Sequence, residues 1–386
     1  MTCKWRYLWF AVFIGTGTGC STSSGEEPGG QLFERVDVTV GVRTSAVLAA
    51  FLDSDDRLDL LVVGGDQVIS LQGRGDGRFD VAGSVPAGEH AVDLALADLD
   101  EDGLNDLAVA NHDTEYVTLL FGLPGGGFEV RASSRLEVNV SPHPHAVRLN
   151  DVDGDGHADL LVDDRRAEAV RLFRGVGHGG FKKSTRISVG GDPYRGMILV
   201  DIDGDGETDL VTPNPDHVSV LIGDGMGGFA QDTVLRPGFA PFSVTAADFN
   251  GDGLTDLAAG SGEGAGALAV WLGSAAGVFQ AGGEYELAVG PTKLAVADLT
   301  GDGRAEVIVT SYVGGEIAVL VGGDRPTLYR IELAGNPYGV ATGDFDGDGR
   351  IDFAIANNGV EHITVFLSRS YRDQANSSQA KLTNRF

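Results

Sequence analysis

The chain has 386 residues and a formal net charge of −28, with 56 acidic residues against 28 lysines and arginines. So acidic a surface excludes nucleic acid and anionic lipid as direct partners, because both need basic side chains to replace their counterions. The 58 glycines are about twice the ordinary share of roughly 7 % and indicate many tight turns. Both cysteines, Cys3 and Cys20, lie near the start of the chain, so the rest of it can form no disulfide and no cysteine-based metal site.

The first 19 residues have the layout of an export signal. Lys4 and Arg6 precede an apolar run at residues 7–14, which is too short to span a bilayer. The small residues before Cys20 resemble the lipobox of bacterial lipoproteins, although Gly17 stands where that family usually has leucine. The resemblance implies that a signal peptide, residues 1–19, is removed and that Cys20 is acylated. The alternative is an ordinary cleaved signal with an incidental cysteine.

Residues 20–30 are then the lipidated cysteine and a flexible polar tether. We expect an exported protein of the bacterial cell envelope, at the outer membrane or surface, that contacts the membrane through its lipid only. Without the lipid it would be periplasmic or secreted. The folded domain is expected at residues 31–370, and the polar residues 371–386 are expected to form a tail.

A nine-residue acidic motif, D-x-D-x-D-G-x-x-D, recurs along the folded domain. Successive copies start 46 to 53 residues apart, and self-similarity at such a period is the signature of a repeat architecture. The seven copies occupy residues 51–59, 98–106, 151–159, 201–209, 248–256, 298–306 and 344–352.

The spacing of the motif suits calcium, which takes six to eight oxygen ligands. Carboxylates at positions 1, 3, 5 and 9 and the main-chain carbonyl of position 7 can converge on one ion. Glycine at position 6 permits the positive φ of the sharp turn. Four carboxylates this close repel by roughly 1 kcal/mol per pair even at the dielectric of water, and a divalent cation turns that repulsion into attraction. The alternative is a solvated acidic turn.

Five copies carry the full set and are expected to bind calcium. Their expected ligands are Asp98, Asp100, Asp102, Leu104, Asp106, Asp151, Asp153, Asp155, His157, Asp159, Asp201, Asp203, Asp205, Glu207, Asp209, Asp248, Asn250, Asp252, Leu254, Asp256, Asp344, Asp346, Asp348, Arg350 and Asp352. A sixth candidate site consists of Asp298, Thr300, Asp302, Arg304 and Glu306. The copy that begins at Phe51 has lost its first acid and its glycine, so we expect it to be empty.

Each acidic loop lies between two short apolar segments, as the second copy shows. Strands are expected there at residues 92–97, 106–110 and 116–121, and after a Gly-rich turn ending in Phe128 a fourth is expected at residues 129–138. A unit of four strands that repeats about every 47 residues, without helical periodicity, is typical of a β-propeller blade.

The seventh copy reaches its third strand at residues 363–367 and then has no fourth. A lone fourth-strand pattern, FERVDVTVG, stands instead at residues 33–41. We predict that this segment completes the seventh blade and closes the ring, which leaves no sheet edge free. The expected fold is therefore all-β, a seven-bladed β-propeller of four-stranded blades.

The acidic loops and the Gly-turn-aromatic words resemble the FG-GAP, or VCBS, repeats of bacterial surface proteins and of integrin α-subunit propellers. The resemblance covers nearly all of residues 31–370. It implies a seven-bladed propeller with calcium in the loops that join first and second strands. It implies no particular ligand, because the repeat occurs in adhesins, in lectins, and beside or within some polysaccharide-degrading enzymes.

In integrin-like propellers, partners bind on the face opposite the calcium loops, where the chain leads into each blade. There a bulky residue follows proline at His145, Tyr194, Phe242 and Tyr338. Such side chains around a channel mouth would suit sugar stacking or a peptide. The alternative is that each pair only seals one blade onto the next. His143 and His145 flank a proline, and we interpret them as loop shape rather than as a metal site.

Catalytic signatures are missing from the sequence. It has no G-x-S-x-G, no H-E-x-x-H, no phosphate-binding glycine loop and no cysteine after Cys20. We therefore expect a binding or adhesion propeller for a glycan or protein partner, and no enzyme. The alternatives are a propeller-type polysaccharide-degrading enzyme and a structural subunit of an envelope complex.

Overall fold

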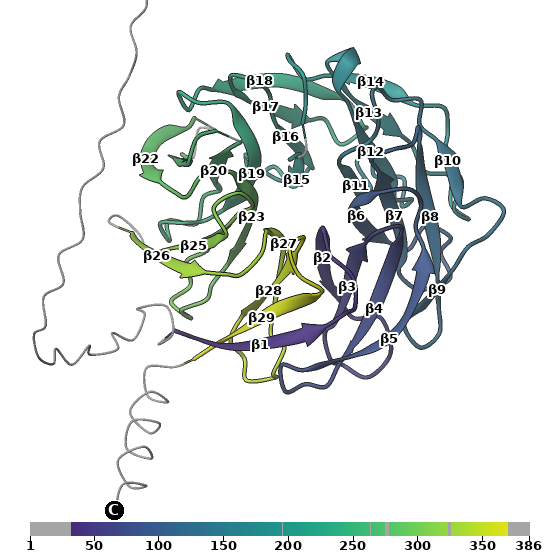
Figure 1. Cartoon of the computed structure of the whole chain (residues 1–386). Coiled ribbons are helices and arrows are strands. Elements are labelled where there is room, and N and C mark those ends of the chain that lie inside the picture. Colours follow the sequence, from purple (N-terminus) through teal and green to yellow (C-terminus); the bar gives the residue numbers. More distant parts are fainter. Residues whose placement is uncertain (1–31, 195, 263, 275–277, 323–325, 370–386) are drawn as a thin grey trace, which may run out of the picture.

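The computed structural model describes residues 32–194, 196–262, 264–274, 278–322 and 326–369. Seven antiparallel sheets surround a central axis, and Figure 1 looks along that axis. Each sheet is one blade, with its first strand beside the axis and its last strand at the outer rim. The expected seven-bladed all-β propeller is confirmed. The predicted signal peptide, Cys20, the tether and the tail from residue 371 lie outside the described residues.

The first three blades share one plan, in which a meander of strands runs from the axis outward. The first blade consists of β2 (Ala46–Ala50), β3 (Asp59–Gly64), β4 (Gln67–Gly73) and β5 (Phe79–Pro86). The second consists of β6 (Ala91–Ala97), β7 (Asp106–Asn111), β8 (Tyr116–Leu123), β9 (Gly127–Glu129) and β10 (Arg135–Glu137). The third consists of β11 (Val147–Asn150), β12 (Asp159–Asp164), a 3-10 turn (Arg165–Ala167), β13 (Ala169–Phe173) and β14 (Thr185–Ser188).

The next three blades repeat this plan, and the seventh takes its outer strand from the beginning of the domain. The fourth blade consists of β15 (Ile198–Val200), β16 (Asp209–Pro213), β17 (Val218–Gly223) and β18 (Phe229–Leu235). The fifth consists of β19 (Pro241–Ala247), β20 (Asp256–Ser261), β21 (Ala267–Leu272) and β22 (Gln280–Glu286). The sixth consists of β23 (Pro291–Ala297), β24 (Glu306–Ser311), β25 (Glu316–Val321) and β26 (Thr327–Glu332). The seventh consists of β27 (Pro337–Gly343), β28 (Asp352–Asn357), β29 (His362–Ser368) and β1 (Phe33–Thr39).

The second strand of every blade is buried along its whole length. Both of its faces are covered by neighbouring blades, which explains why these strands are almost continuous apolar runs, such as DLLVVG in β3. The fourth strands at the rim are mostly exposed and polar. Each gap between two adjacent blades holds its own apolar cluster, so the core is a ring of separate layers around the axis.

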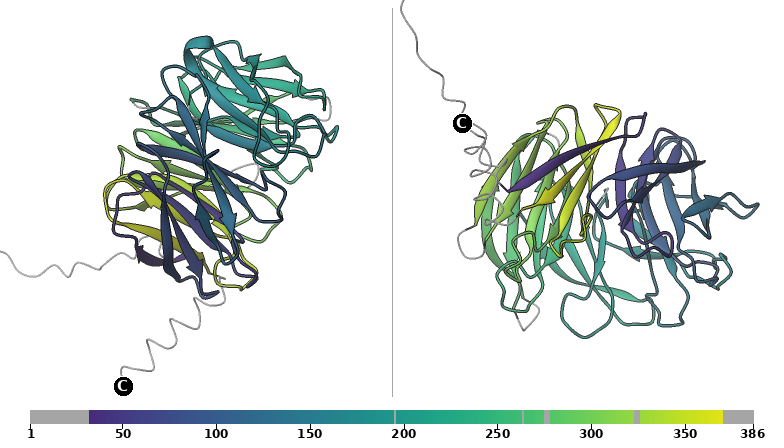
Figure 2. Two further views of the ribbon diagram at one scale, coloured as in Figure 1. Left: turned by 90° about the vertical axis from the view of Figure 1, so that its right-hand side faces the viewer. Right: turned by 90° about the horizontal axis from the view of Figure 1, so that it is seen from below.

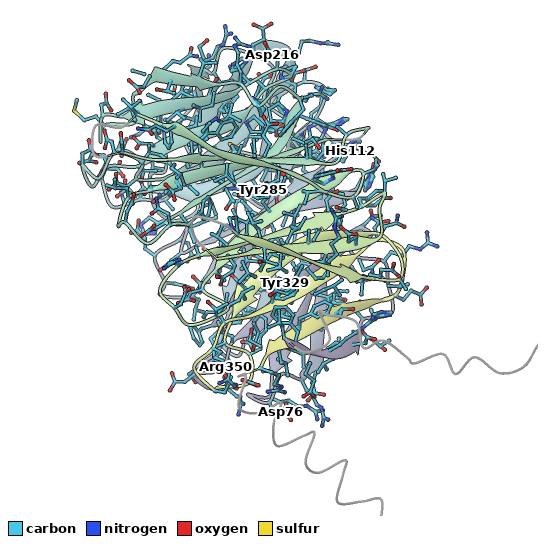
Figure 3. All side chains as sticks on the ribbon, turned by 90° about the vertical axis from the view of Figure 1, so that its left-hand side faces the viewer. Asp76, His112, Asp216, Tyr285, Tyr329 and Arg350 are labelled. Atoms are coloured by element: carbon cyan, nitrogen blue, oxygen red, sulfur yellow. The ribbon has the colours of Figure 1, made fainter. Side chains whose placement is uncertain are left out.

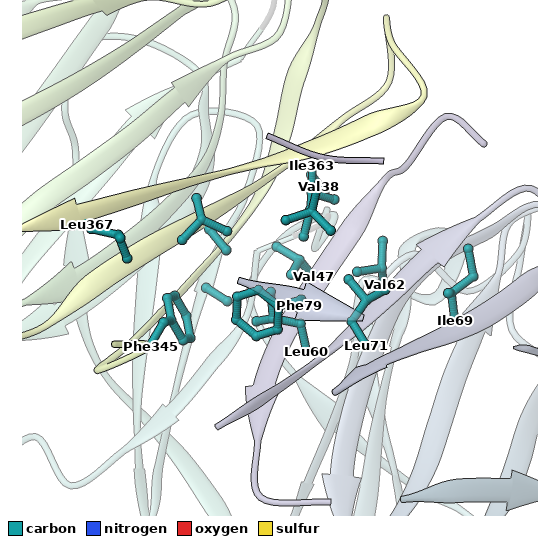
Figure 4. Packing of buried hydrophobic residues seen from close by; sticks show 14 residues of the cluster. Val38, Val47, Leu60, Val62, Ile69, Leu71, Phe79, Phe345, Ile363 and Leu367 are labelled. Atoms are coloured by element: carbon teal, nitrogen blue, oxygen red, sulfur yellow. The ribbon is translucent and has the colours of Figure 1, made fainter. Parts of the chain in front are cut away.

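Closure of the ring by the N-terminal strand is confirmed. β1 pairs with β29 in antiparallel register from Phe33 opposite Ser368 to Thr39 opposite His362. The right-hand view of Figure 2 shows β1, in purple, running along the yellow strands of the seventh blade. Val38 of β1 is only 8 % exposed and packs with Ile363 in the cluster between the seventh and first blades, which Figure 4 shows from close by.

One predicted element differs from the structure. The expected fourth strand at residues 129–138 is divided into β9 and β10, both of which pair with β8. A turn separates them, because the Arg131 and Ser134 main chains are hydrogen-bonded to each other (3.0 Å) and the Ser134 hydroxyl accepts a bond from the Arg131 amide (2.8 Å). The side chain of Ser134 thus favours a turn within a segment whose pattern reads as one strand.

Candidate metal and ligand sites

The acidic loops lie on one face of the propeller. Each follows the first strand of its blade, and because the second strand runs back, the loops that lead into the blades lie on the opposite face. Figure 3 shows the two faces edge-on, with Arg350 of the seventh acidic loop on one side and His112, after β7, on the other.

The first aspartate of a loop folds the loop around its own carboxylate. Asp151 accepts bonds from the amides of Gly154 and Gly156, each at 2.8 Å. Both glycines have positive φ, 71° and 87°, which a residue with a Cβ rarely adopts. In the degenerate first copy Asp56 takes the place of the second glycine and also has a positive φ, 56°. The loop conformation therefore survives there without glycine.

The carboxylate at the ninth position is buried and joins two parts of the blade. In the fourth blade, Asp209 accepts a bond from the Ile202 amide in the loop (2.8 Å) and one from the Gly223 amide at the end of β17 (2.7 Å). Asp59 of the degenerate copy makes the equivalent pair of bonds. We had expected only a ligand role for this position. Asp59 is kept at the ninth position of the copy that lost its first acid, and this retention was the sequence signal for a structural role.

Burial and neighbouring charges raise the pKa values of these ninth carboxyls. Burial, and then the carboxylates at loop positions 3 and 5, raise the pKa of Asp209 above its ordinary value. The same two causes raise the pKa of Asp352 to about 6. At Glu306, burial and the charges of Asp302 and Asp298 raise the pKa to about 7. A bound cation would relieve this repulsion.

Several loops have the donor set of a cation site. Carboxylate oxygens lie within 4.8 Å of one another in the second, third and fourth loops, as three groups: Asp98, Asp100 and Asp106; Asp151, Asp153 and Asp159; Asp201, Asp203 and Asp209. In the third loop, Oδ1 of Asp153 is buried without a hydrogen-bond partner, while Oδ2 is 3.0 Å from Nε of Arg174. An unpartnered buried carboxylate oxygen fits a metal ligand. Arginines also pair with the third position in two further loops, Arg131 with Asp100 and Arg369 with Asp346.

The hydrogen bond from the end of the third strand to the ninth carboxylate explains why that strand ends in glycine. A Cβ on Gly223 would lie 2.2 Å from the main-chain carbonyl oxygen of Thr208. We expect Gly223→Ala to lower the free energy of unfolding by about 1–3 kcal/mol, because the backbone must shift away from Asp209. Urea unfolding measures this. Gly83→Ala, where nothing lies within 4 Å of the new Cβ, is the matched control. Equal losses in the two variants would contradict this explanation.

On the opposite face, a hollow of about 200 Å³ opens at the axis. It is built from the loops that lead into the blades and the loops between second and third strands, so five blades contribute to it. Its lining combines aromatic, imidazole, aliphatic and small polar side chains: Ser45, His90, Val92, His112, Phe242, Pro291, Thr292, Tyr312, Val313, Tyr338 and Asn358.

The predicted ligand-face residues are divided by the structure. Phe242 and Tyr338 line the hollow. Tyr194 is not a lining residue but packs edge to face against Phe242, with ring centroids 5.2 Å apart. His145 is 3 % exposed, with its Nδ1 3.1 Å from Asp163, and so presents no open surface to a sugar. Tyr312, which stands edge to face with Tyr338 at 5.7 Å, joins the lining instead.

A cluster of charged side chains joins three blades next to the hollow. Asp93 of β6 contacts Arg148 of β11 (2.8 Å) and Lys293 of β23 (3.5 Å), so three blades meet at one carboxylate. Burial opposes its ionisation, but Lys293 and Arg148 together lower the pKa of Asp93 below its ordinary value. The charged pair Asp93–Lys293 follows directly after the lining residues Val92 and Thr292.

Four histidines gather beside the hollow. The centroid of His112 is 5.0 Å from that of His90, 3.8 Å from His143 and 5.2 Å from His145. Burial, followed by the neighbouring imidazoles, lowers the pKa of His143 to about 4. We had interpreted His143 and His145 as loop shape only. The cluster has no spacing signal, because its members come from three separate segments: before β6, after β7 and before β11.

Comparison with known proteins identifies the repeat. The FG-GAP-like repeat matches five overlapping segments of the chain, at residues 52–109, 98–162, 151–212, 201–259 and 248–309. The chain belongs to the FG-GAP-like repeat family. Each matched segment begins at one acidic loop and ends in the second strand of the next blade. This family is defined by a repeat, and the match indicates no enzyme family.

Solved structures share the propeller at low sequence identity. BBS1N, from a complex with ARL6DN soaked with lead, aligns with a TM-score of 0.60 at 12 % identity, over 88 % of this chain and 97 % of that one. A functionally unknown protein from Desulfotomaculum acetoxidans aligns with a TM-score of 0.56 at 12 % identity, over 83 % and 91 %. An Agrocybe aegerita lectin that recognises non-reducing terminal N-acetylglucosamine aligns with a TM-score of 0.52 at 18 % identity, over 83 % and 87 %.

No curated protein sequence matches this FG-GAP chain significantly. Within the described residues, no helix has the length and apolar character needed to cross a membrane.

Proposed function

We propose that this FG-GAP propeller is a carbohydrate-binding protein whose ligand site is the axial hollow. The observation that carries the proposal is the composition of that hollow, in which three aromatic side chains, Phe242, Tyr312 and Tyr338, lie among small polar groups. Sugars present flat C–H faces that stack on aromatic rings, and hydroxyls that need hydrogen-bond partners. Both kinds of contact are available here.

The size of the hollow favours a small part of a glycan. Its volume of about 200 Å³ is below the roughly 300–1,000 Å³ of pockets that enclose drug-sized ligands. It therefore suits a single sugar residue or the end of a chain. The hydroxyls of Ser45 and Thr292 donate to main-chain carbonyls, at 3.1 and 3.0 Å. The Thr292 oxygen also accepts from the Tyr312 amide (3.3 Å), and each hydroxyl retains a lone pair to accept from a sugar. The likeness to a lectin that recognises a terminal sugar supports this choice.

Calcium in the acidic loops would stabilise the opposite face. The residues that would hold it are the aspartates and asparagine of the five complete loops, with the Asp298 loop as a sixth candidate. There the ion would supply charge neutralisation and no chemistry. We further propose, from the N-terminal resemblance, that the protein is exported and anchored to the bacterial envelope through lipid on Cys20. An anchored binding protein presents its ligand site to extracellular glycans.

A glycan array probed with the calcium-loaded protein tests the proposal. We expect binding to one class of saccharide, weakened about 10-fold or more by Phe242→Ala and by Tyr338→Ala, since a lost stacking contact of about 1.4 kcal/mol corresponds to that factor. Phe51→Ala is the control, because Phe51 is a 56 % exposed aromatic in the first acidic loop, on the other face.

Two results would reject the carbohydrate assignment. One is saccharide binding that both hollow variants leave unchanged. The other is binding to a peptide array in place of every glycan, which would make the hollow a protein-recognition site.

A further inference from the structure

We propose that His112, His143 and His145 form a binding site for a transition-metal ion of the zinc class, next to the axial hollow. One ligand nitrogen of each ring lies within 4.8 Å of the other two. A tetrahedral zinc ion, with Zn–N bonds of about 2.0–2.1 Å, places its nitrogens roughly 3.4 Å apart. The nitrogen–nitrogen separations therefore need to shorten by no more than about 1.4 Å for the three rings to close on an ion.

The three imidazole rings differ in burial and in the segments that hold them. His145 is buried at the start of the third blade, whereas His112 and His143 are only partly buried. His143 stands between Pro142 and Pro144, whose fixed φ angles restrict the loop that carries it. The two partly buried rings leave the cluster accessible to an ion from solution, and the buried ring supplies a ligand whose position the core fixes.

Carboxylates orient two of the three imidazoles. Nδ1 of His145 lies 3.1 Å from Oδ2 of Asp163, whose Oδ1 accepts bonds from the amides of His145 (2.7 Å) and Ala146 (2.8 Å). Nδ1 of His112 lies 2.8 Å from Oδ1 of Asp113. A ring that donates from Nδ1 to a carboxylate has its lone pair on Nε2. This carboxylate–histidine pairing is the usual support of metal-binding histidines.

The donor chemistry separates this site from the acidic loops. Imidazole nitrogen suits zinc, copper and nickel, whereas calcium takes oxygen ligands. His112, labelled in Figure 3, lies on the opposite face from the acidic loops, and His143 and His145 belong to the segment that leads into β11 on that same face. Three protein ligands leave one coordination position for water or for a ligand atom. The inference goes beyond the proposed carbohydrate binding and does not depend on it.

Zinc titration by calorimetry, in saturating calcium so that the acidic loops are occupied, tests the proposal on the full chain. We expect about one zinc equivalent for the wild-type protein, and at least 10-fold weaker binding in His112→Ala and His143→Ala. His178→Asn is the matched control, because His178 is an exposed histidine outside the cluster and asparagine tolerates its positive φ of 53°. His145→Ala is avoided, since it would leave Asp163 buried without its imidazole partner.

A spectroscopic readout identifies the ligands. Cobalt(II) in the wild-type protein should give the strong visible absorption of a tetrahedral nitrogen-ligated site, and His143→Ala should lack it while melting, in calcium without zinc, at the temperature of the wild type. Absence of zinc binding by the wild-type protein would overturn the proposal. So would affinity that is unchanged in His112→Ala and His143→Ala. Glycan binding is scored separately, so failure of either proposal is distinguishable.

Discussion

Chelation of calcium should lower the melting temperature of the folded domain by roughly 20 °C. An ion present at a hundredfold its dissociation constant adds about 2.7 kcal/mol to stability, so five such sites add on the order of 13 kcal/mol. For a domain of this size, 1 kcal/mol corresponds to about 1.5 °C. Without the ion, carboxylates at positions 3 and 5 repel the buried ninth carboxyl, as they do at Asp209. Calorimetric melting with and without chelator measures the shift.

Single loops can be tested by substitution. Asp151→Asn should remove about one calcium equivalent and lower the melting temperature more in calcium than without it, because without calcium only one of the two glycine bonds to Asp151 is lost. Asp53→Asn is the control, because Asp53 belongs to the first copy, which we expect to be empty, and it already accepts a bond from Gln72 (2.9 Å). If the chelator leaves melting unchanged and elemental analysis finds no calcium, the acidic loops are solvated turns.

Removal of β1 should be the second large effect. A chain that starts at residue 43 loses the strand that pairs with β29, the contact of Val38 with the first blade, and the ring of Phe33, which stands 5.0 Å from that of Phe353. From the lost apolar burial and main-chain bonds we expect at least about 5 kcal/mol of destabilisation. The newly free edge of β29 should also promote aggregation. Urea unfolding and light scattering measure the two consequences.

A chain that starts at residue 32 is the control for this truncation, since it keeps β1. A single substitution in β1 tests the same contact without removing the strand. Val38→Asp places a charge at a site that is 8 % exposed, whereas Val81→Asp alters a valine that is 54 % exposed on the outer strand of the first blade. Destabilisation by Val38→Asp no greater than that by Val81→Asp would show that the closing strand does not hold the ring.

The repeated features were predictable because each depends on neighbours in the chain. The acidic motif specifies its own loop through bonds such as that from Gly156 to Asp151. The second strands could be recognised because burial on both sides demands an unbroken apolar run. Even closure by residues 33–41 was predictable, since the seventh copy lacks a strand that the beginning of the domain supplies. The turn at Arg131 and Ser134 and the structural role of the ninth carboxylate, as at Asp209, were missed.

The spacing of the acidic motif along the sequence thus determined the number of blades, their strand order and the carboxylates of each loop. Only the tertiary structure decided that Tyr312 and Phe242 line one hollow, that Asp93 joins three blades, and that His112 lies against His143 and His145. The physical reason is the circular arrangement. It brings first strands and their loops together at the axis from blades about fifty to two hundred residues apart in the chain, where no local pattern relates one side chain to another.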